Sequence, residues 1–210
     1  RDAPERIATL DGTAVIVAPD GTPTESEVER VGNRDLAAFA GEGRYVEVDL
    51  AGLPIRVASL YLPKGAVPGH HAQKPEEADT PKYERKMRFL SGLARHLTRA
   101  RRSAAQAGRE YVIVGDFNIA NTRHDLKNWR SNQRTDGFLP EERDWFTAQL
   151  GPRRLVDVVR SMHPDQDGPY SWWSWRGQAF ANDTGWRIDY HLATPKLARA
   201  AVRAESLREA

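Results

Sequence analysis

Short stretches in which apolar residues alternate with polar ones, or run without a break, predict the β-strands of this chain. They cover residues 12–18, 44–50, 55–62, 111–114, 170–175 and 186–193. The second and third stretches are joined by a compact turn at 51–54, which predicts an antiparallel hairpin. The run 111–114 has no alternation, because its four residues are all β-branched or aromatic, and this indicates a strand buried on both faces.

Apolar residues spaced three and four apart predict one long amphipathic helix over residues 81–105. Its other face carries basic residues, including Lys86, and we expect that face to be solvated. A second helix is predicted over 140–150, because its first turn is acidic, and a helical stub is predicted from Pro195. Residues 155–159 are apolar and support either a helix or a strand.

Polar stretches rich in glycine, proline or charge separate these elements. Residues 1–11 show no pattern, 20–43 predict a loop with at most a short helical piece, and 63–80 predict a long loop. No internal repeat or linker divides the chain. The combination predicts an α/β fold in which two β-sheets pack face to face as a sandwich and helices cover the outside, giving four layers.

Residues able to carry chemistry follow directly after the strand 111–114. Gly115 ends the apolar run, and Asp116 and Asn118 come next, two positions apart. Residues at that spacing on an extended segment point to the same side, so both side chains would face one point beyond the strand. A carboxylate beside a carboxamide suits a divalent cation or an activated water next to a phosphate. The alternative, which the motif alone supports equally, is a turn that caps the strand's exit.

Two further polar side chains belong to predicted strands. Tyr61 stands at the end of a strand before Pro63, so its phenol would lie at the rim of the sheet. The alternative is a tyrosine that covers the edge of the core with its hydroxyl in water. Asp189 interrupts the apolar stretch 186–193. A buried carboxylate needs a partner, so the alternative to a site role is a salt bridge with an arginine.

Four of the six tryptophans fall in the last two predicted strands: Trp172, Trp173, Trp175 and Trp186. We expect half of them to be core, whereas the others could line a pocket for a flat or apolar group. The loop after the Asp116 strand is polar and basic and suits contacts with phosphate groups. It contains Asn128, Arg130, Asn132 and Arg134.

His70 and His71 stand side by side in the long loop. Neighbouring histidines can ligate a metal, but adjacent side chains on an exposed chain diverge, so we expect a solvated loop instead.

Composition narrows the class of protein. A chain of 210 residues with 40% hydrophobic and 29% charged residues fits one soluble globular domain, and no apolar run is long enough to cross a membrane. Its lack of cysteine excludes disulfides, thiolate metal ligands and a cysteine nucleophile, and it fits a reducing, cytoplasmic compartment. The net charge of +2 allows a local patch to bind a polyanion without requiring it.

Several motifs together resemble the exonuclease III family of apurinic/apyrimidinic endonucleases, in the family's order and near its spacing. They are YLPKG (61–65), GDFNIA (115–120), DLKNWRSN (125–132), GFLPEERDWF (137–146), VDVVR (156–160), PYSWWSW (169–175) and GWRIDYHLATP (185–195). Each motif is weak alone, but the set is specific, and the likeness runs from about Gly12 to the end.

The resemblance implies a metal-dependent phosphodiesterase that cleaves double-stranded DNA 5′ to an abasic site and removes nucleotides from 3′ ends. Mg²⁺ would be its cofactor, with Mn²⁺ as an alternative, and the protein would act as a monomer without a membrane partner. By this likeness Asp116 positions and deprotonates the attacking water, while Asn118 holds the phosphate or the shell of the metal. Tyr61 lies against the scissile phosphate, and Asp189 matches the carboxylate that orients a catalytic histidine.

The same resemblance assigns substrate contacts to the later motifs. Trp172, Trp186 and Ile188 match the pocket that receives an extrahelical abasic sugar, and a base-free sugar fits a snug apolar pocket that excludes an intact nucleotide. Arg187, within the same motif, and Asn132, within the polar loop, are further substrate-binding candidates.

The resemblance also has gaps. Nothing before Gly12 matches the family's N-terminal strands, which carry the glutamate that is the main metal ligand. The last histidine is His191, so the family's final Ser-Asp-His strand is not matched. Thr135 replaces a usual asparagine, and the loop 65–81 is longer than usual. We therefore expect residues 1–210 to form a single nuclease-like domain that lacks its N-terminal strands and its C-terminal strand and is inactive by itself.

Two other functions remain open. A phosphodiesterase or phosphatase for lipids or inositol phosphates would use the same fold, although the proposed sugar pocket and the polar loop argue against it. A non-catalytic DNA-binding remnant is favoured by the unmatched glutamate and histidine.

Overall fold

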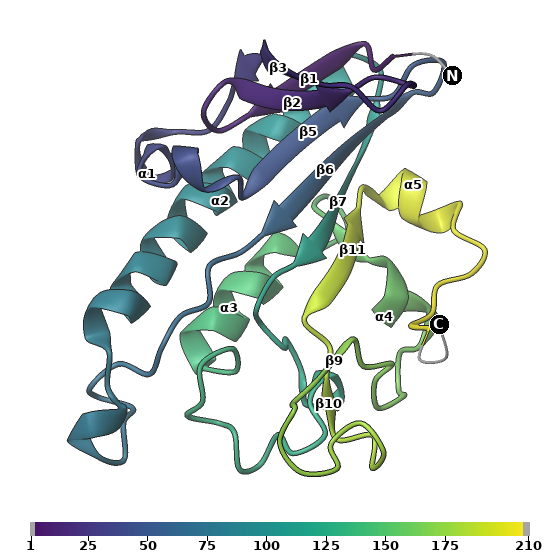
Figure 1. Cartoon of the computed structure of the whole chain (residues 1–210). Helices are drawn as coiled ribbons and strands as arrows, with labels where there is room; N and C mark the ends of the chain where they lie inside the picture. The colour runs from purple at the N-terminus through teal and green to yellow at the C-terminus, as the bar shows by residue number, and fades with distance from the viewer. Residues whose placement is uncertain (1–2, 208–210) are drawn as a thin grey trace.

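The computed structural model describes residues 3–207, and a mixed sheet of seven strands in the order β4-β1-β5-β6-β7-β11-β8 lies at its centre (Figure 1). Its strands are β1 (Arg6–Thr9), β4 (Glu29–Arg30), β5 (Tyr45–Asp49), β6 (Ile55–Tyr61), β7 (Glu110–Asp116), β8 (Val156–Asp157) and β11 (Asp189–Ala193). The remaining strands form two ribbons, β2 (Thr13–Val17) with β3 (Pro23–Glu27) and β9 (Trp172–Trp173) with β10 (Gly185–Trp186).

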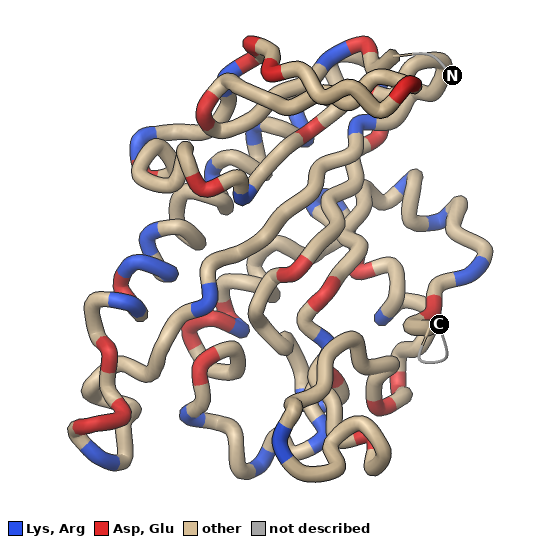
Figure 2. The backbone as a smooth tube through the Cα atoms, viewed as in Figure 1, with Lys and Arg blue, Asp and Glu red and all other residues tan. Residues whose placement is uncertain are grey.

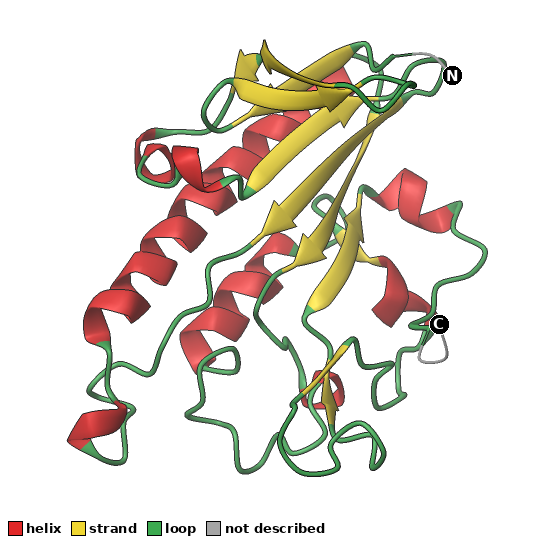
Figure 3. Cartoon of the chain, viewed as in Figure 1, coloured by secondary structure: helices red, strands yellow, loops and turns green. Residues whose placement is uncertain are grey.

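The two long helices lie along one face of the sheet, whereas two shorter ones lie near β11 (Figure 3). The helices are α1 (Arg34–Ala37), α2 (Thr80–Gln106), α3 (Pro140–Gln149), α4 (Val158–Met162) and α5 (Pro195–Arg199), with short 3-10 helices at Ala40–Glu42, Pro75–Glu77 and Arg123–Asp125. Among the helices of residues 3–207, none combines the length and the apolar character that a bilayer span requires.

Helix α2 is the crossover that allows β6 and β7 to pair in parallel. Asp79 caps its first turn by accepting from the backbone N–H of Lys82, and Pro81 occupies the first turn, where its missing N–H costs nothing. The antiparallel pairs β5–β6 and β7–β11 flank this unit. The ends of β6 and β7 therefore open at the same edge of the sheet, where α/β proteins commonly place their sites.

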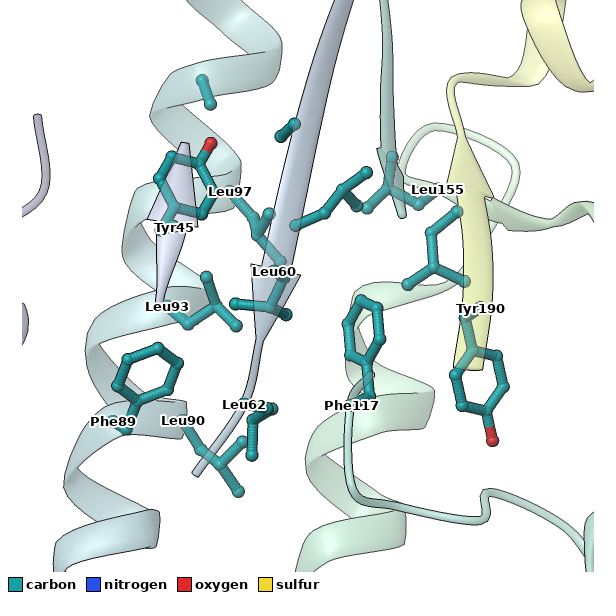
Figure 4. Close-up of a cluster of buried hydrophobic side chains, with 14 of the residues drawn as sticks. Tyr45, Leu60, Leu62, Phe89, Leu90, Leu93, Leu97, Phe117, Leu155 and Tyr190 are labelled. Carbon is teal, nitrogen blue, oxygen red and sulfur yellow. The ribbon is translucent and has the colours of Figure 1, made fainter. Parts of the chain in front are cut away.

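The core lies between the sheet and the two long helices (Figure 4). Leu93 and Leu97 of α2 lie beside Leu60 of β6, and Phe117 lies beside Tyr190 with ring centroids 5.5 Å apart. Burial alternates along β5 and β6, so one face of these strands serves the core.

The predicted α/β class, the hairpin of β5 and β6 and both long helices are confirmed. Residues 155–159, for which the sequence allowed a helix or a strand, contain both, because β8 is followed at once by α4. Within residues 3–207, the strands outside the main sheet form only two-stranded ribbons.

Residues 1–11, whose sequence shows no pattern, contain β1. The expectation of a loop at 20–43 is wrong where β3 and β4 form, whereas the short helical piece allowed there is found as α1. These strands are short, and pairing stabilises them: β1 pairs with β5 over four positions in the main sheet, and β3 pairs with β2 in the ribbon. The strand expected at 186–193 is broken, since β10 ends at Trp186 and β11 begins at Asp189. The one at 170–175 shrinks to the two residues of β9.

Gly115 lies where β7 approaches β6 most closely. Its φ is +134°, and a Cβ at this position would come within 2.0 Å of the carbonyl oxygen of Leu60. Because that neighbour is backbone in the middle of the sheet, it has no freedom to move aside.

We expect Gly115→Ala to lower the free energy of unfolding by about 3 kcal/mol or more, through steric overlap and an unfavourable φ. Urea denaturation measures the loss. Gly108→Ala is the matched control: Gly108 also has a positive φ, +70°, but nothing lies within 4 Å of its added Cβ. It should cost only about 1 kcal/mol, and equal losses in the two variants would contradict this account.

Candidate active site at the ends of β6 and β7

Three polar side chains form a row across neighbouring strands at one edge of the sheet. Tyr61 of β6 is in register with Asp116 of β7, and Asp116 is in register with Asp189 of β11. Residues opposite each other in paired strands present their side chains on the same face. The alternating burial of the three strands places this row on the face turned away from the core.

Asp116 and Asn118 are joined by a tight turn rather than by an extended segment. Asn118 has a left-handed φ of 48°, and its backbone N–H donates to Asp116 Oδ1 at 2.7 Å. Its Nδ2 donates to Asp116 Oδ2 at 3.1 Å and to the carbonyl oxygen of Leu62 at 2.9 Å. The structure thus brings the two predicted residues together, and both carboxylate oxygens of Asp116 are held in place.

Burial raises the pKa of Asp116 to about 6, and the negative charge of Asp189 acts in the same direction, whereas the hydrogen bond from the Asn118 N–H opposes the shift. At neutral pH the carboxylate is therefore ionised but close to its pKa. A group in that condition is well suited to accept a proton from a water molecule.

A buried ammonium group holds the turn between Asp116 and Asn118 from the side of the core. Lys86 of α2 is fully buried, and its Nζ donates to the carbonyl oxygen of Asn118 at 2.9 Å. The same Nζ lies 2.6 Å from Glu142 Oε1 and 3.4 Å from Asp136 Oδ1. The expectation that Lys86 belongs to a solvated face is wrong. Its position four residues before Leu90 places it on the apolar stripe of the helix, and that spacing was the signal available in the sequence.

Glu142, in the first turn of α3, is the buried counter-ion of Lys86. Its Oε2 accepts from the backbone N–H groups of Gly137 and Leu139 at 2.8 and 3.1 Å. Burial raises the pKa of Glu142, and the Lys86 ammonium opposes that shift. The pair fixes the loop before α3 against the turn that carries Asn118.

Tyr61 and Asp189 both reach solvent. Tyr61 is 54% exposed, and the guanidinium of Arg44 lies over its ring, 5.2 Å from the centroid. Asp189 is exposed, and within residues 3–207 no arginine forms a salt bridge with it, so the structural alternative for Asp189 is not found. Ser171 Oγ accepts from the N–H groups of Ile188 and Asp189, both at 3.1 Å, and this sets the start of β11.

The predicted pocket residues occupy different depths. Trp172 and Trp186 are partners in the β9–β10 ribbon, with Trp172 41% exposed and Trp186 packed on the small cluster that contains Leu126 and Phe138. Ile188 is buried, at 9% exposure. The two tryptophans are therefore cross-strand partners, and their role in holding a sugar stays a prediction.

Arg187 points into the protein instead of toward the surface. Its guanidinium donates to Asp125 Oδ1 at 2.8 Å and to both carboxylate oxygens of Asp157, and only 2% of the residue is exposed. Arg160 donates to the same oxygen of Asp125 at 2.5 Å. These ion pairs give the Arg187 guanidinium a structural role. The geometry does not support the prediction that Arg187 contacts the substrate.

Asn132, by contrast, lies on the surface of the polar loop. Its Nδ2 donates to the carbonyl oxygen of Asn128 at 2.8 Å, and Arg130 stacks its guanidinium over the ring of Trp129 at 4.6 Å. Figure 2 shows basic residues spaced along α2 and in the loops at the lower end of the molecule. A phosphate contact from Asn132 stays a prediction.

A second cluster of possible metal ligands lies outside this row. Ligand atoms of His70, His71 and Glu141 all lie within 4.8 Å of one another, which makes them a candidate metal-binding group. The expectation of diverging, solvated histidines is therefore wrong for His71, whose Nε2 lies 3.1 Å from Glu141 Oε1.

Comparison with known proteins places this geometry in a family. A sequence profile of the Endonuclease/Exonuclease/phosphatase family matches residues 12–209. An exodeoxyribonuclease of Bacillus subtilis is 42% identical over 86 residues, which are 41% of this chain and 34% of that protein. The DNA repair nuclease APEX1 of Danio rerio is 38% identical over 91 residues, 43% of this chain and 29% of that protein. The matched stretches thus span about a third of these relatives' length.

Two solved structures share the fold. An AP endonuclease from Archaeoglobus fulgidus superposes with a TM-score of 0.63 at 24% identity and covers 90% of this chain and 69% of its own. A 3′-5′ exonuclease (NExo) from Neisseria meningitidis gives a TM-score of 0.62 at 23% identity, over 94% of this chain and 61% of its own. The resemblance drawn from the sequence motifs is confirmed by these matches.

Asp116→Asn should stabilise the metal-free protein in a pH-dependent way. The folded-state pKa of Asp116, about 6, lies above the ordinary value of 3.8, so its contribution to stability is present at low pH and is lost as the pH rises through 6. The variant's gain in melting temperature should therefore grow between about pH 4 and pH 6 and level off above. Thermal melts in a chelator measure it, and a gain that does not change with pH would contradict the raised pKa.

Proposed function

Because the chain belongs to the Endonuclease/Exonuclease/phosphatase family, we propose that it is the catalytic part of a metal-dependent DNA-repair nuclease. It would hydrolyse the phosphodiester bond 5′ to an abasic site and remove nucleotides from 3′ ends. The observation that carries the proposal is the row of Tyr61, Asp116 and Asp189, with Asn118 bound to Asp116 at the end of β7. The names of the relatives, exodeoxyribonuclease and DNA repair nuclease, point to the same chemistry.

Each residue of the row has a role that its position supports. Asp116, ionised near its pKa, takes the proton from the attacking water. Asn118 orients that carboxylate through two hydrogen bonds and turns its remaining amide oxygen to the phosphate or metal shell. Tyr61, exposed beside Asp116, is placed to contact the phosphate, and the nearby Arg44 adds positive charge.

The donor set fits a hard divalent cation. Asp116 and Asp189 face each other across paired strands, and the raised pKa of Asp116 reflects their mutual repulsion together with burial. Oxygen ligands of this kind suit Mg²⁺, with Mn²⁺ as an alternative. When bound, such an ion offsets the phosphate charge and acidifies water. Asp116 and Asn118 would hold it, and Asp189 would lie next to it.

Abasic selectivity is assigned to the paired indoles of Trp172 and Trp186, with Ile188 behind them. A pocket between flat apolar side chains accepts a sugar that has lost its base and excludes one that retains it. Asn132 and the basic side chains of its loop would contact flanking phosphates of double-stranded DNA. The protein would act on DNA as a monomer in the cytoplasm.

A phosphatase or phosphodiesterase acting on inositol phosphates is the second candidate, because the same row could serve any phosphate ester. A non-catalytic DNA-binding protein is the third. Cleavage of an abasic duplex, of an inositol phosphate, or of neither separates the three. The assay uses the purified protein with Mg²⁺.

Asp116→Asn in that protein should reduce cleavage of an abasic duplex by at least about a hundredfold, because it removes the general base while keeping the size of the side chain. The affinity for the same duplex, measured in a chelator, should change little. If affinity collapsed while the rate per bound complex stayed normal, Asp116 would position the substrate and would not be the base.

Trp186→Ala tests the sugar pocket. Removing an indole that contacts a sugar should weaken binding by about 1–3 kcal/mol, the scale of aromatic contacts in nucleic-acid platforms. Selectivity for abasic over undamaged duplex should then narrow by about tenfold, with a small drop in melting temperature. A variant that melts far earlier but keeps its selectivity would identify Trp186 as a core residue only.

A further inference from the structure

Two adjacent histidines and a glutamate from a different element converge at one point beside α2. His71 Nε2 lies 3.1 and 3.2 Å from the two oxygens of Glu141, and His70 Nε2 lies 3.5 Å from Glu141 Oε1. The two imidazole rings have centroids 4.6 Å apart and are tilted by 46°. Neighbouring side chains on an open loop ordinarily point apart, so this convergence requires an explanation.

The spacing of the ligand atoms matches a tetrahedral metal site. Bonds of about 2.0–2.1 Å to nitrogen and oxygen place neighbouring tetrahedral ligands about 3.3 Å from each other. The distances from Glu141 to the two histidines, 3.1 and 3.5 Å, bracket that value. The ligand nitrogens of the two imidazoles also lie within 4.8 Å of each other.

A fourth residue orients the carboxylate. Tyr83 of α2 donates its hydroxyl to Glu141 Oε1 at 3.0 Å. The edge of its ring meets His70, with centroids 6.1 Å apart. Residues that hold a ligating group by hydrogen bonds in this way are a regular feature of metal centres.

We propose that His70, His71 and Glu141 bind one Zn²⁺ or a similar borderline transition-metal ion, distinct from the cation assigned to Asp116. Two imidazoles and one carboxylate are a ligand set that favours zinc, whereas Mg²⁺ prefers oxygen ligands alone. A water molecule completes the tetrahedron, since the loop is open to solvent. The proposal rests on this cluster and not on the nuclease function.

Such an ion would fasten the long loop between β6 and α2 to the first turn of α3. The loop's own hydrogen bonds are mostly local: the Asp79 N–H donates to the carbonyl oxygen of Val67 at 3.0 Å, and the Gly69 N–H donates to Thr80 Oγ1 at 3.2 Å. It starts at Leu62, whose carbonyl oxygen accepts from Asn118. Zinc occupancy would therefore stiffen a segment that begins at the candidate active site.

The test is a titration of the untagged chain with Zn²⁺, monitored by calorimetry in the presence of excess Mg²⁺. A parallel titration uses Co²⁺ as a spectroscopic probe of the coordination geometry. We expect one Zn²⁺ per chain and a visible Co²⁺ absorption typical of four-coordinate geometry. His71→Ala and Glu141→Gln should each weaken Zn²⁺ binding by about tenfold or more. Zn²⁺ should also raise the melting temperature of the wild-type chain but not of His71→Ala.

His124→Ala is the matched control, because His124 also lies 3.0 Å from a carboxylate, Asp167, but is not in the cluster. It should bind Zn²⁺ like the wild type, and so should Asp116→Asn. Equal Zn²⁺ affinity in wild type and His71→Ala, or loss of binding in Asp116→Asn alone, would overturn the proposal. In that event the cluster would be an ordinary hydrogen-bonded ion pair.

Discussion

The site depends on one buried ammonium group. Lys86 brings together α2, the turn after β7 and the first turn of α3, because its Nζ reaches the carbonyl oxygen of Asn118 and the carboxylate of Glu142. Taking both charges out of water is costly, and it is tolerated because Glu142 also accepts two backbone N–H groups from the loop before α3. Removing either partner would leave an uncompensated buried charge. Asn118, and through it Asp116, is therefore held by the packing of the whole core and not by the loop alone.

A second buried ion cluster has the same function on the other side of the row. Arg187 lies between Asp125 and Asp157, and Arg160 shares Asp125. The strand is interrupted between Trp186 and Asp189, and Arg187 turns inward to these carboxylates within the interruption. The interruption lets Trp186 pair with Trp172 in the small ribbon while Asp189 pairs with Asp116 in the main sheet. The ion pairs of Arg187 with Asp125 and Asp157 thus hold the chain at the point where it passes from the ribbon to the main sheet.

The local sequence pattern was enough to predict the elements with strong periodicity. It was not enough to predict the contacts between those elements. The spacing of Leu90, Leu93 and Leu97 specified α2, and the run before Gly115 specified β7. The short strand β1 was missed, because its stability comes from pairing with β5 and not from its own residues. The burial of Lys86 and Arg187 was missed for a related reason. Their charges are compensated by Glu142, Asp125 and Asp157, which are distant in sequence, and no local pattern records such partners.

The distribution of charge around Asp116 constrains any reaction at this site. Asp116 and Asp189 put two negative groups on the face that a phosphate would approach, and burial already disfavours the ionised form of Asp116. Lys86 lies directly beneath, but its ammonium is engaged by Asn118 and Glu142 and has no path to the surface. Arg44 places a positive charge beside the row, because its guanidinium lies over the ring of Tyr61. The same guanidinium also forms a salt bridge with Glu42. One partly neutralised guanidinium is weak compensation for two carboxylates and a phosphodiester, so a divalent cation bound at Asp116 would favour phosphate chemistry at this face.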